Sequence, residues 1–234
     1  MRGIMNKLIK KYSHAWVLLY AFLYMPWFLW LERTVKTDFS VIHIELDDKI
    51  PFMEIFVIPY FLWFAYIFVT VAYFFFRDRS EFYRCTAYLF GGMTVCLLIY
   101  TIWPNGHDLR PNLSALGRDN LFTRLMAWLY GTDTCTNVCP SIHAFNSIGA
   151  CIAIYKSRYL KSMKWLRAGA LILTILICMS TVFLKQHSSF DVICAGLLAL
   201  VMYMAVYVPD YSGLRARHRA RAAARARLRR DRTA

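Results

Sequence analysis

Charged side chains are scarce in this sequence. Asp, Glu, Lys and Arg make up 18% of its 234 residues, whereas hydrophobic residues make up 59% and aromatic residues 17%. An average soluble domain is only about 45–50% apolar, so the composition excludes an ordinary soluble domain and favours a membrane protein. The length fits one compact domain, of which six membrane helices of about 20 residues would occupy roughly half.

The sequence also lacks the cysteine spacing of a zinc site. Its seven cysteines are scattered, and most lie in apolar runs, where cysteine behaves as a small hydrophobic residue. The cysteines therefore give no sign of a metal or cofactor site. No small-residue cleavage site follows the first apolar run, so we expect no cleavable signal peptide.

Six apolar stretches are long enough to be considered as membrane helices. They cover residues 15–31, 52–76, 85–103, 143–155, 165–184 and 190–208. The fourth is short and carries Asn146 and Ser147, so it needs flanking residues to cross a hydrocarbon core of about 30 Å. The prediction is an all-α membrane protein with an N-terminal segment at 1–14, a six-helix transmembrane domain at 15–208 and an Arg-rich tail at 209–234.

The connections between these stretches differ in charge. Residues 156–167 carry five bases and no acid, whereas 32–49 carry five acids and three bases, and 105–133 carry three of each. Cytoplasmic connections are enriched in Lys and Arg, so both termini are predicted to be cytoplasmic, and 32–49 and 105–133 to lie outside. Cys135 and Cys139 then lie in a compartment that permits disulfides, and their spacing fits either a disulfide or two free thiols.

The net charge of +14 comes largely from one place. Residues 214–234 contain nine Arg and one Asp, a net charge of +8. The charge therefore does not indicate a nucleic-acid partner. The tail either lies on anionic lipid, where each base contributes about 1 kcal/mol, or is a solvated segment. The segment 42–52 is predicted to be interfacial or to be a lid over a site.

Three groups of residues with the chemistry of a site fall on the predicted outer face. His187 and Asp191 stand four apart, on one face of a helix, where Asp can fix the tautomer of His and leave its other ring nitrogen as a nucleophile. Ser141, after Pro140, is a candidate N-cap, and His143 a candidate general acid. Taken alone, the His187–Asp191 pair fits a capping or interfacial pair equally well, and the Ser141–His143 motif fits a capped helix with an interfacial histidine better than a catalytic group.

Arg110, followed by Pro111, offers a permanently charged fork that matches phosphate. An anion-binding Arg, a nucleophilic His and an acidic His together are the groups that phosphoryl transfer through a phosphohistidine requires. Binding of haem or a metal by His143 and His187 is the less favoured reading, because bis-histidine ligands usually lie inside a bundle.

The order of these motifs, RP, then PSxH, then SxxxxxxHxxxD, resembles the type 2 phosphatidic acid phosphatase (PAP2) superfamily, which also includes vanadium haloperoxidases and sphingolipid head-group transferases. The resemblance covers residues 110–196. It implies that His187 is the nucleophile, that Asp191 orients it and that His143 protonates the leaving group. It also implies that Arg110 and Ser141 hold the phosphate and that no metal takes part.

Two positions depart from the family pattern. The family has Lys where this chain has Trp103, and Ser-Arg where it has Ser180 and Thr181. Two phosphate-binding cations are therefore missing, and the candidates to replace them are Lys185, His107, Arg118 and Arg124.

The expected activity is dephosphorylation of a lipid phosphate of the phosphatidate, phosphatidylglycerol phosphate or polyprenyl diphosphate type, on the outer face of the cell membrane. The relaxed motifs also resemble inositol-phosphorylceramide and sphingomyelin synthases, so transfer of a phospho-head-group is the alternative.

Overall fold

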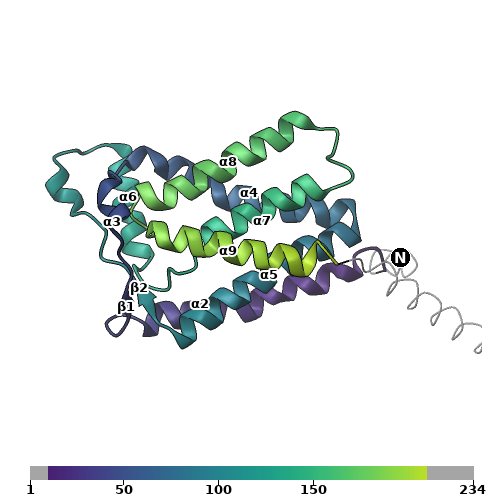
Figure 1. Cartoon of the computed structure of the whole chain (residues 1–234), viewed down its shortest axis with the longest axis horizontal. Helices are drawn as coiled ribbons and strands as arrows, with labels where there is room; N and C mark the ends of the chain where they lie inside the picture. Colours follow the sequence, from purple (N-terminus) through teal and green to yellow (C-terminus); the bar gives the residue numbers. More distant parts are fainter. Residues whose placement is uncertain (1–9, 210–234) are drawn as a thin grey trace, which may run out of the picture.

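The computed structural model describes residues 10–209, so most of the predicted N-terminal segment, and the Arg-rich tail apart from Pro209, lie outside the described residues. Long helices form a bundle (Figure 1). They are η1 with α2 (Ser13–Tyr20 and Ala21–Thr34), α4 (Val57–Arg77), α5 (Arg79–Ile102), α7 (Ile142–Lys156), α8 (Lys164–Phe183) and α9 (Ser189–Val206).

Five helical segments among the described residues are long and apolar enough to cross a membrane. They are Ser13–Thr34, Glu54–Arg77, Arg79–Ile102, Lys164–Phe183 and Ser189–Val206. These five coincide with five of the six predicted stretches, and they make the chain a multi-pass membrane protein.

The fourth predicted stretch, 143–155, corresponds to α7, which is a helix of only 15 residues. Ten of these residues are buried, because α7 packs against α8, α5, α9 and α4. A helix that its neighbours cover does not need the apolar surface of one that faces lipid. A count of six membrane spans remains a prediction.

Close packing fixes α7 in the bundle. The Phe145 ring lies against Gly92 of α5, where an added Cβ would stand 1.9 Å from the ring. Gly149 meets Tyr88 in the same way, at 2.5 Å. Small residues at such crossings allow membrane helices to approach closely, so the position of the α7 N-terminus is set by a tightly packed core.

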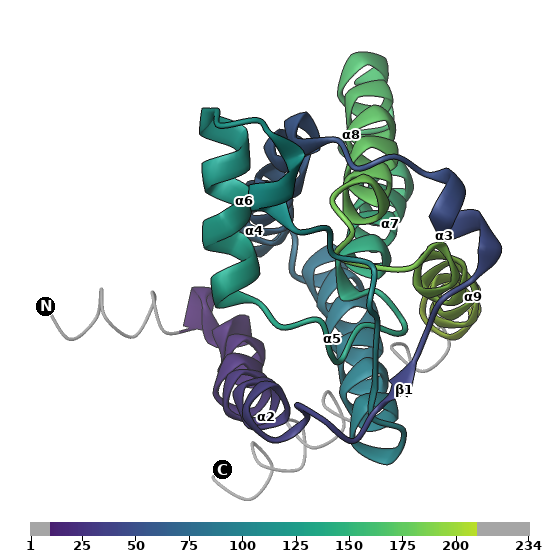
Figure 2. The same cartoon turned by 90° about the vertical axis from the view of Figure 1, so that its left-hand side faces the viewer.

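The connections at one end of the bundle are longer and are partly structured. The connection between α2 and α4 contains β1 (Ser40–Val41), α3 (Glu45–Lys49) and η2 (Glu54–Phe56), and it runs across the ends of the helices (Figure 2). β1 pairs in parallel with β2 (Asn105–Gly106). The connection between α5 and α7 also contains η3 (Leu113–Leu116) and α6 (Leu121–Thr132), a helix that we did not predict.

Candidate active site

The connection between α8 and α9 makes a tight turn that positions His187. Lys185 adopts the left-handed conformation, with φ of 51°, directly after the C-cap Leu184. Its N–H donates to the Val182 carbonyl (3.1 Å), and the N–H of Gln186 donates to the Thr181 carbonyl (2.9 Å). These two bonds form a Schellman motif with Lys where Gly is usual. The His187 N–H donates to the same Thr181 carbonyl at 3.0 Å.

Asp191 binds the start of its own helix as well as His187. Its Oδ2 accepts from the Ser188 N–H at 2.9 Å, in a capping box at the N-terminus of α9. The same oxygen lies 3.3 Å from Nδ1 of His187. Asp191 is fully buried. Because the helix cap holds the carboxylate in place, the carboxylate can in turn fix the orientation of the imidazole.

His143 lies directly opposite His187, in the first turn of α7. The His143 Nδ1 is 3.4 Å from Nε2 of His187. The rings of Tyr60 and Trp63 of α4 pack against His143 with centroid distances of 4.8 and 4.5 Å. Ser141 is the N-cap of α7, as predicted, and its Oγ accepts from the Ala144 N–H at 3.3 Å.

The turn that precedes α7 is tied to α9. The Ser141 N–H donates to the Asp191 carbonyl at 3.2 Å, and Tyr100 donates to the Pro140 carbonyl at 2.5 Å. Cys135 and Cys139 are both free thiols. The sequence elements around Pro140 and Asp191 are therefore brought together, with both predicted histidines in contact.

Arg110 lies beside this pair, and most of its donors are engaged by the protein. Its Nη1 donates to the carbonyls of Tyr130 (3.3 Å) and Asp133 (2.9 Å), and its Nη2 donates to the Thr134 carbonyl (2.7 Å) and to Gln186 Oε1 (2.5 Å). Its guanidinium also lies over the Tyr130 ring at 4.5 Å. Nε is buried, with no hydrogen-bond partner among the described residues. A phosphate role for Arg110 remains a prediction.

His107 supports the same turn through a hydrogen bond to the backbone of Gln186. Its Nδ1 accepts the Leu109 N–H at 3.2 Å, so its Nε2 carries the proton and donates to the Gln186 carbonyl at 2.9 Å. Burial, followed by the nearby His187 and Arg110, lowers the pKa of His107 to about 3. A neutral His107 is a structural support for the turn and supplies no positive charge.

The side chains at the two positions where the family has cations, and the candidates to replace those cations, each have partners within the protein. The Trp103 indole donates to Ser40 Oγ, and Thr181 Oγ1 donates to the Cys178 carbonyl within α8. Arg118 pairs with Glu54, and Arg124 pairs with Asp119. Lys185 is the remaining candidate beside the histidines, and its ammonium donates to the Asp47 carbonyl at 2.6 Å.

Asp47 is a residue whose position in the site we did not predict. It is fully buried in α3, and its carboxylate accepts hydrogen bonds from Ser188 Oγ (2.6 Å), the Ser189 N–H (2.7 Å) and Ser189 Oγ (2.7 Å). Burial opposes its negative charge, but these bonds and one from the Ile44 N–H outweigh burial and lower the pKa of the Asp47 carboxyl. The connection 35–56 therefore clamps the turn that carries His187.

No group of three His, Cys, Asp or Glu side chains within residues 10–209 is arranged to hold a metal ion. Comparison with protein families matches residues 85–211 to the PAP2 superfamily, which is more than half of the 234 residues. No curated protein and no solved structure matches the chain.

Proposed function

Because this chain belongs to the PAP2 superfamily, whose members are phosphatases or related phosphotransferases, we propose that it is a metal-independent lipid phosphate phosphatase that works through a phosphohistidine. The observation that carries the proposal is the position of His187 between Asp191 and His143, with 3.3 Å on one side and 3.4 Å on the other. In this proposal Asp191, next to Nδ1 of His187, orients the ring, and His143, next to Nε2, protonates the leaving group.

The hydrogen bonds support one assignment of the protons, which we propose. Asp191 accepts the Nδ1 proton of His187, so Nε2 keeps its lone pair and is the nucleophile. The neighbouring nitrogen, His143 Nδ1, must then carry the proton in this contact. In the resting state the proton on His143 Nδ1 points at His187 Nε2. When a substrate lies between the two rings, this proton is within reach of the leaving group.

The reaction then has two steps. His187 Nε2 attacks phosphorus, the bond to the lipid oxygen breaks, and that oxygen takes a proton from His143, which acts in its doubly protonated form and becomes a neutral imidazole. In the second step, water gives a proton to His143 and attacks the phosphohistidine, which releases inorganic phosphate and restores His187. Asp191 stabilises the positive charge on the imidazole during both steps.

Positive groups around the histidines support binding of the phosphate. Arg110 and Lys185 flank the turn that carries His187, and Ser141 begins α7, whose N-terminus favours an anion. We propose that Lys185 replaces the cations missing at Trp103 and Thr181. It already reaches across the turn, and one of its three protons is engaged with Asp47.

The relaxed motifs favour one alternative, which is transfer of the phospho-head-group to a lipid alcohol. The first step is the same for both activities, and only the acceptor in the second step differs. The proposed substrate is a phosphatidate-, phosphatidylglycerol phosphate- or polyprenyl diphosphate-type lipid. The charge of the connections predicts that its phosphate lies at the outer membrane face.

The test is release of inorganic phosphate by purified protein from a panel of these lipid phosphates, with and without EDTA. We expect release from at least one of them, unchanged by EDTA. A product that appears only when a lipid alcohol is added, without free phosphate, would assign the transferase. No turnover of any phosphate ester, with an intact fold, would overturn the proposal.

A further inference from the structure

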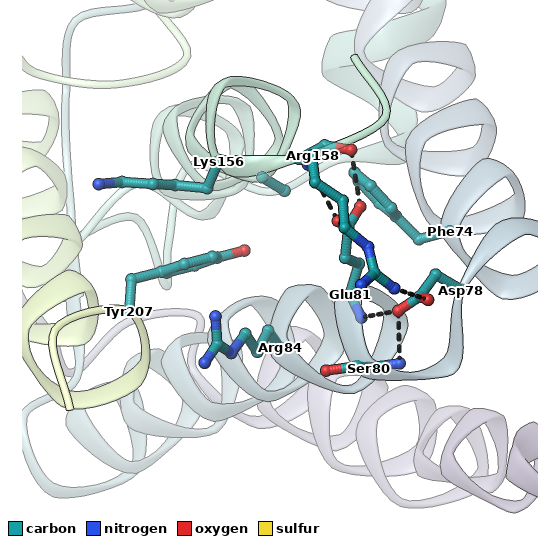
Figure 3. A pocket seen from close by; sticks show the side chains of 10 residues that line it. Phe74, Asp78, Ser80, Glu81, Arg84, Lys156, Arg158 and Tyr207 are labelled. Carbon is teal, nitrogen blue, oxygen red and sulfur yellow. Dashed lines mark hydrogen bonds and ion pairs between the residues drawn. The ribbon is translucent and has the colours of Figure 1, made fainter. Parts of the chain in front are cut away.

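A second cluster of charged groups lies at the opposite end of the bundle from His187. A cavity of about 250 Å³ opens there, where the α4–α5 connection, the end of α7 and the end of α9 meet (Figure 3). Its polar lining comes largely from six side chains, Asp78, Glu81, Arg84, Lys156, Arg158 and Tyr207. None of them belongs to the proposed phosphatase machinery.

The two acids of this cavity already have partners. Asp78 accepts the N–H groups of Ser80 and Glu81 at 2.9 Å each, and it pairs with Arg158. Glu81 accepts from Ser157 Oγ at 2.6 Å and from the Arg158 N–H at 3.0 Å. The negative charge on this side of the cavity is therefore bound to groups of the protein.

Two of the three bases that line the cavity have no acidic partner among residues 10–209. Arg84 and Lys156 form no ion pair with any residue in the range 10–209. Arg84 Nε is buried without a hydrogen-bond partner in that part of the chain, and the Lys156 ammonium lies 5.0 Å from the centre of the Tyr203 ring. In Figure 3 the Tyr207 hydroxyl points into the space that these side chains surround.

These groups fit a phosphate. Arg offers a fork of donors that matches phosphate oxygens, Lys adds a point charge and Tyr adds a hydroxyl donor. The cavity lies at one end of the membrane-spanning helices, and the charge of the 156–167 connection predicts this end to be cytoplasmic. Basic pockets between membrane helices on the cytoplasmic side are suited to anionic lipid head groups.

We propose that the cavity lined by Arg84, Lys156 and Tyr207 binds the phosphate of an anionic lipid head group in the leaflet opposite the active site. Its occupant would touch the end of α7, which carries His143, and the end of α9, which follows the turn that carries His187. Lys156 ends α7, which begins next to Ser141, and Tyr207 follows α9, which begins next to Ser188. Along α7 the two sites are about 20 Å apart.

The test measures binding of short-chain phosphatidylglycerol to the full chain in detergent by native mass spectrometry. This lipid has a phosphodiester and no terminal phosphate, so it is a poor match to a phosphatase site, and the His187→Ala background removes turnover altogether. The variant is Arg84→Gln with Lys156→Gln. The matched control is Lys161→Gln with Lys164→Gln. Both bases are exposed and lie in the 156–167 connection, so this variant loses the same amount of charge at the same end of the bundle.

We expect the cavity variant to bind phosphatidylglycerol about tenfold more weakly or worse, the effect of losing charge-assisted hydrogen bonds, and the control to bind like the parent. Tyr207→Phe keeps the ring and should also weaken binding. Equal binding by all variants, or equal loss in the control, would overturn the proposal. Displacement of the lipid by millimolar inorganic phosphate, with the same dependence on Arg84, would overturn the lipid assignment in favour of a free phosphate.

Discussion

Replacing Asp47 with Asn should damage catalysis from outside the catalytic pair. The change keeps the size of the side chain and removes its charge. It also presents an amide N–H₂ group to Ser188 and Ser189, whose three donors now point at the carboxylate at 2.6 to 2.7 Å. One or two of these donors lose their acceptor in a fully buried place.

The structure gives the size of the effect. Hydrogen bonds to a charged group contribute about 1.5–3 kcal/mol each, and a buried donor left without a partner costs a similar amount. The serine hydroxyls can rotate toward other acceptors, so we expect about 3 kcal/mol in total. For a chain of this length that corresponds to a fall in Tm of roughly 10 °C. Misplacement of His187 by about 1 Å lowers kcat about 100-fold.

The assay combines phosphate release with thermal unfolding in detergent, at a temperature at which the variant is folded. The matched control is Asp48→Asn, because Asp48 is the next residue, is exposed and, among residues 10–209, hydrogen-bonds through its carboxylate to His43 at 2.8 Å and not to Ser188 or Ser189. We expect kcat to fall for Asp47→Asn, with KM little changed, and both to stay at the wild-type values for Asp48→Asn. Wild-type kcat in the Asp47 variant would refute the view that the connection 35–56 positions the nucleophile.

Four further predictions follow from the site and the topology. His187→Ala should lower turnover by several orders of magnitude and Asp191→Asn by less, since only the former removes the nucleophile; near-normal rates would contradict the mechanism. Vanadate should inhibit and EDTA should not, whereas recovery of EDTA-treated protein by a divalent ion would indicate metal catalysis. In a background without native cysteines, an impermeant thiol reagent applied to intact cells should label Asn112→Cys and spare Ser162→Cys, and the reverse pattern would invert the topology. The pKa of His107 is lowered to about 3 in the folded state, so between about pH 6.5 and pH 3 His107 binds a proton only in the unfolded state, and the free energy of unfolding should decrease as the pH is lowered through that window. The Tm of His107→Gln should therefore fall less than that of the wild type between pH 7 and pH 5, and an equal fall in both proteins would exclude this cause.

The membrane-spanning helices follow from the sequence because apolar length is a local property. Each of the five long segments is recognisable without reference to its neighbours. α7 is different, since it has only 15 residues and four other helices pack against it. Its burial depends on packing, which a hydropathy pattern does not contain.

The candidate site likewise contains features that local sequence could predict and contacts that it could not. The side chains of His187 and Asp191 meet, but not on one helix face as their spacing predicted, because α9 begins at Ser189 and His187 lies in the turn before the N-cap Ser188. The position of His143 after the N-cap Ser141 was predictable from local sequence. The contacts of Asp47 with Ser188 and Ser189 join residues 141 and 142 positions apart. A short acidic segment in a connection gives no sign of such a partner. The helix α6 was missed for a related reason, because it lies in a charge-balanced stretch without the length of a span.

The contact between the two histidines has a consequence for the affinity of substrates. Nucleophilic attack needs about 3 Å between nitrogen and phosphorus, and the acid needs a further 3 Å or so to the leaving oxygen, so the reactive separation of the two nitrogens is roughly 6 Å. The resting separation is 3.4 Å. In the proposed mechanism a substrate must therefore push the two rings apart, against α4 on one side and the capped start of α9 on the other. Part of its binding free energy is used for that opening, which weakens the binding of every substrate by the same amount.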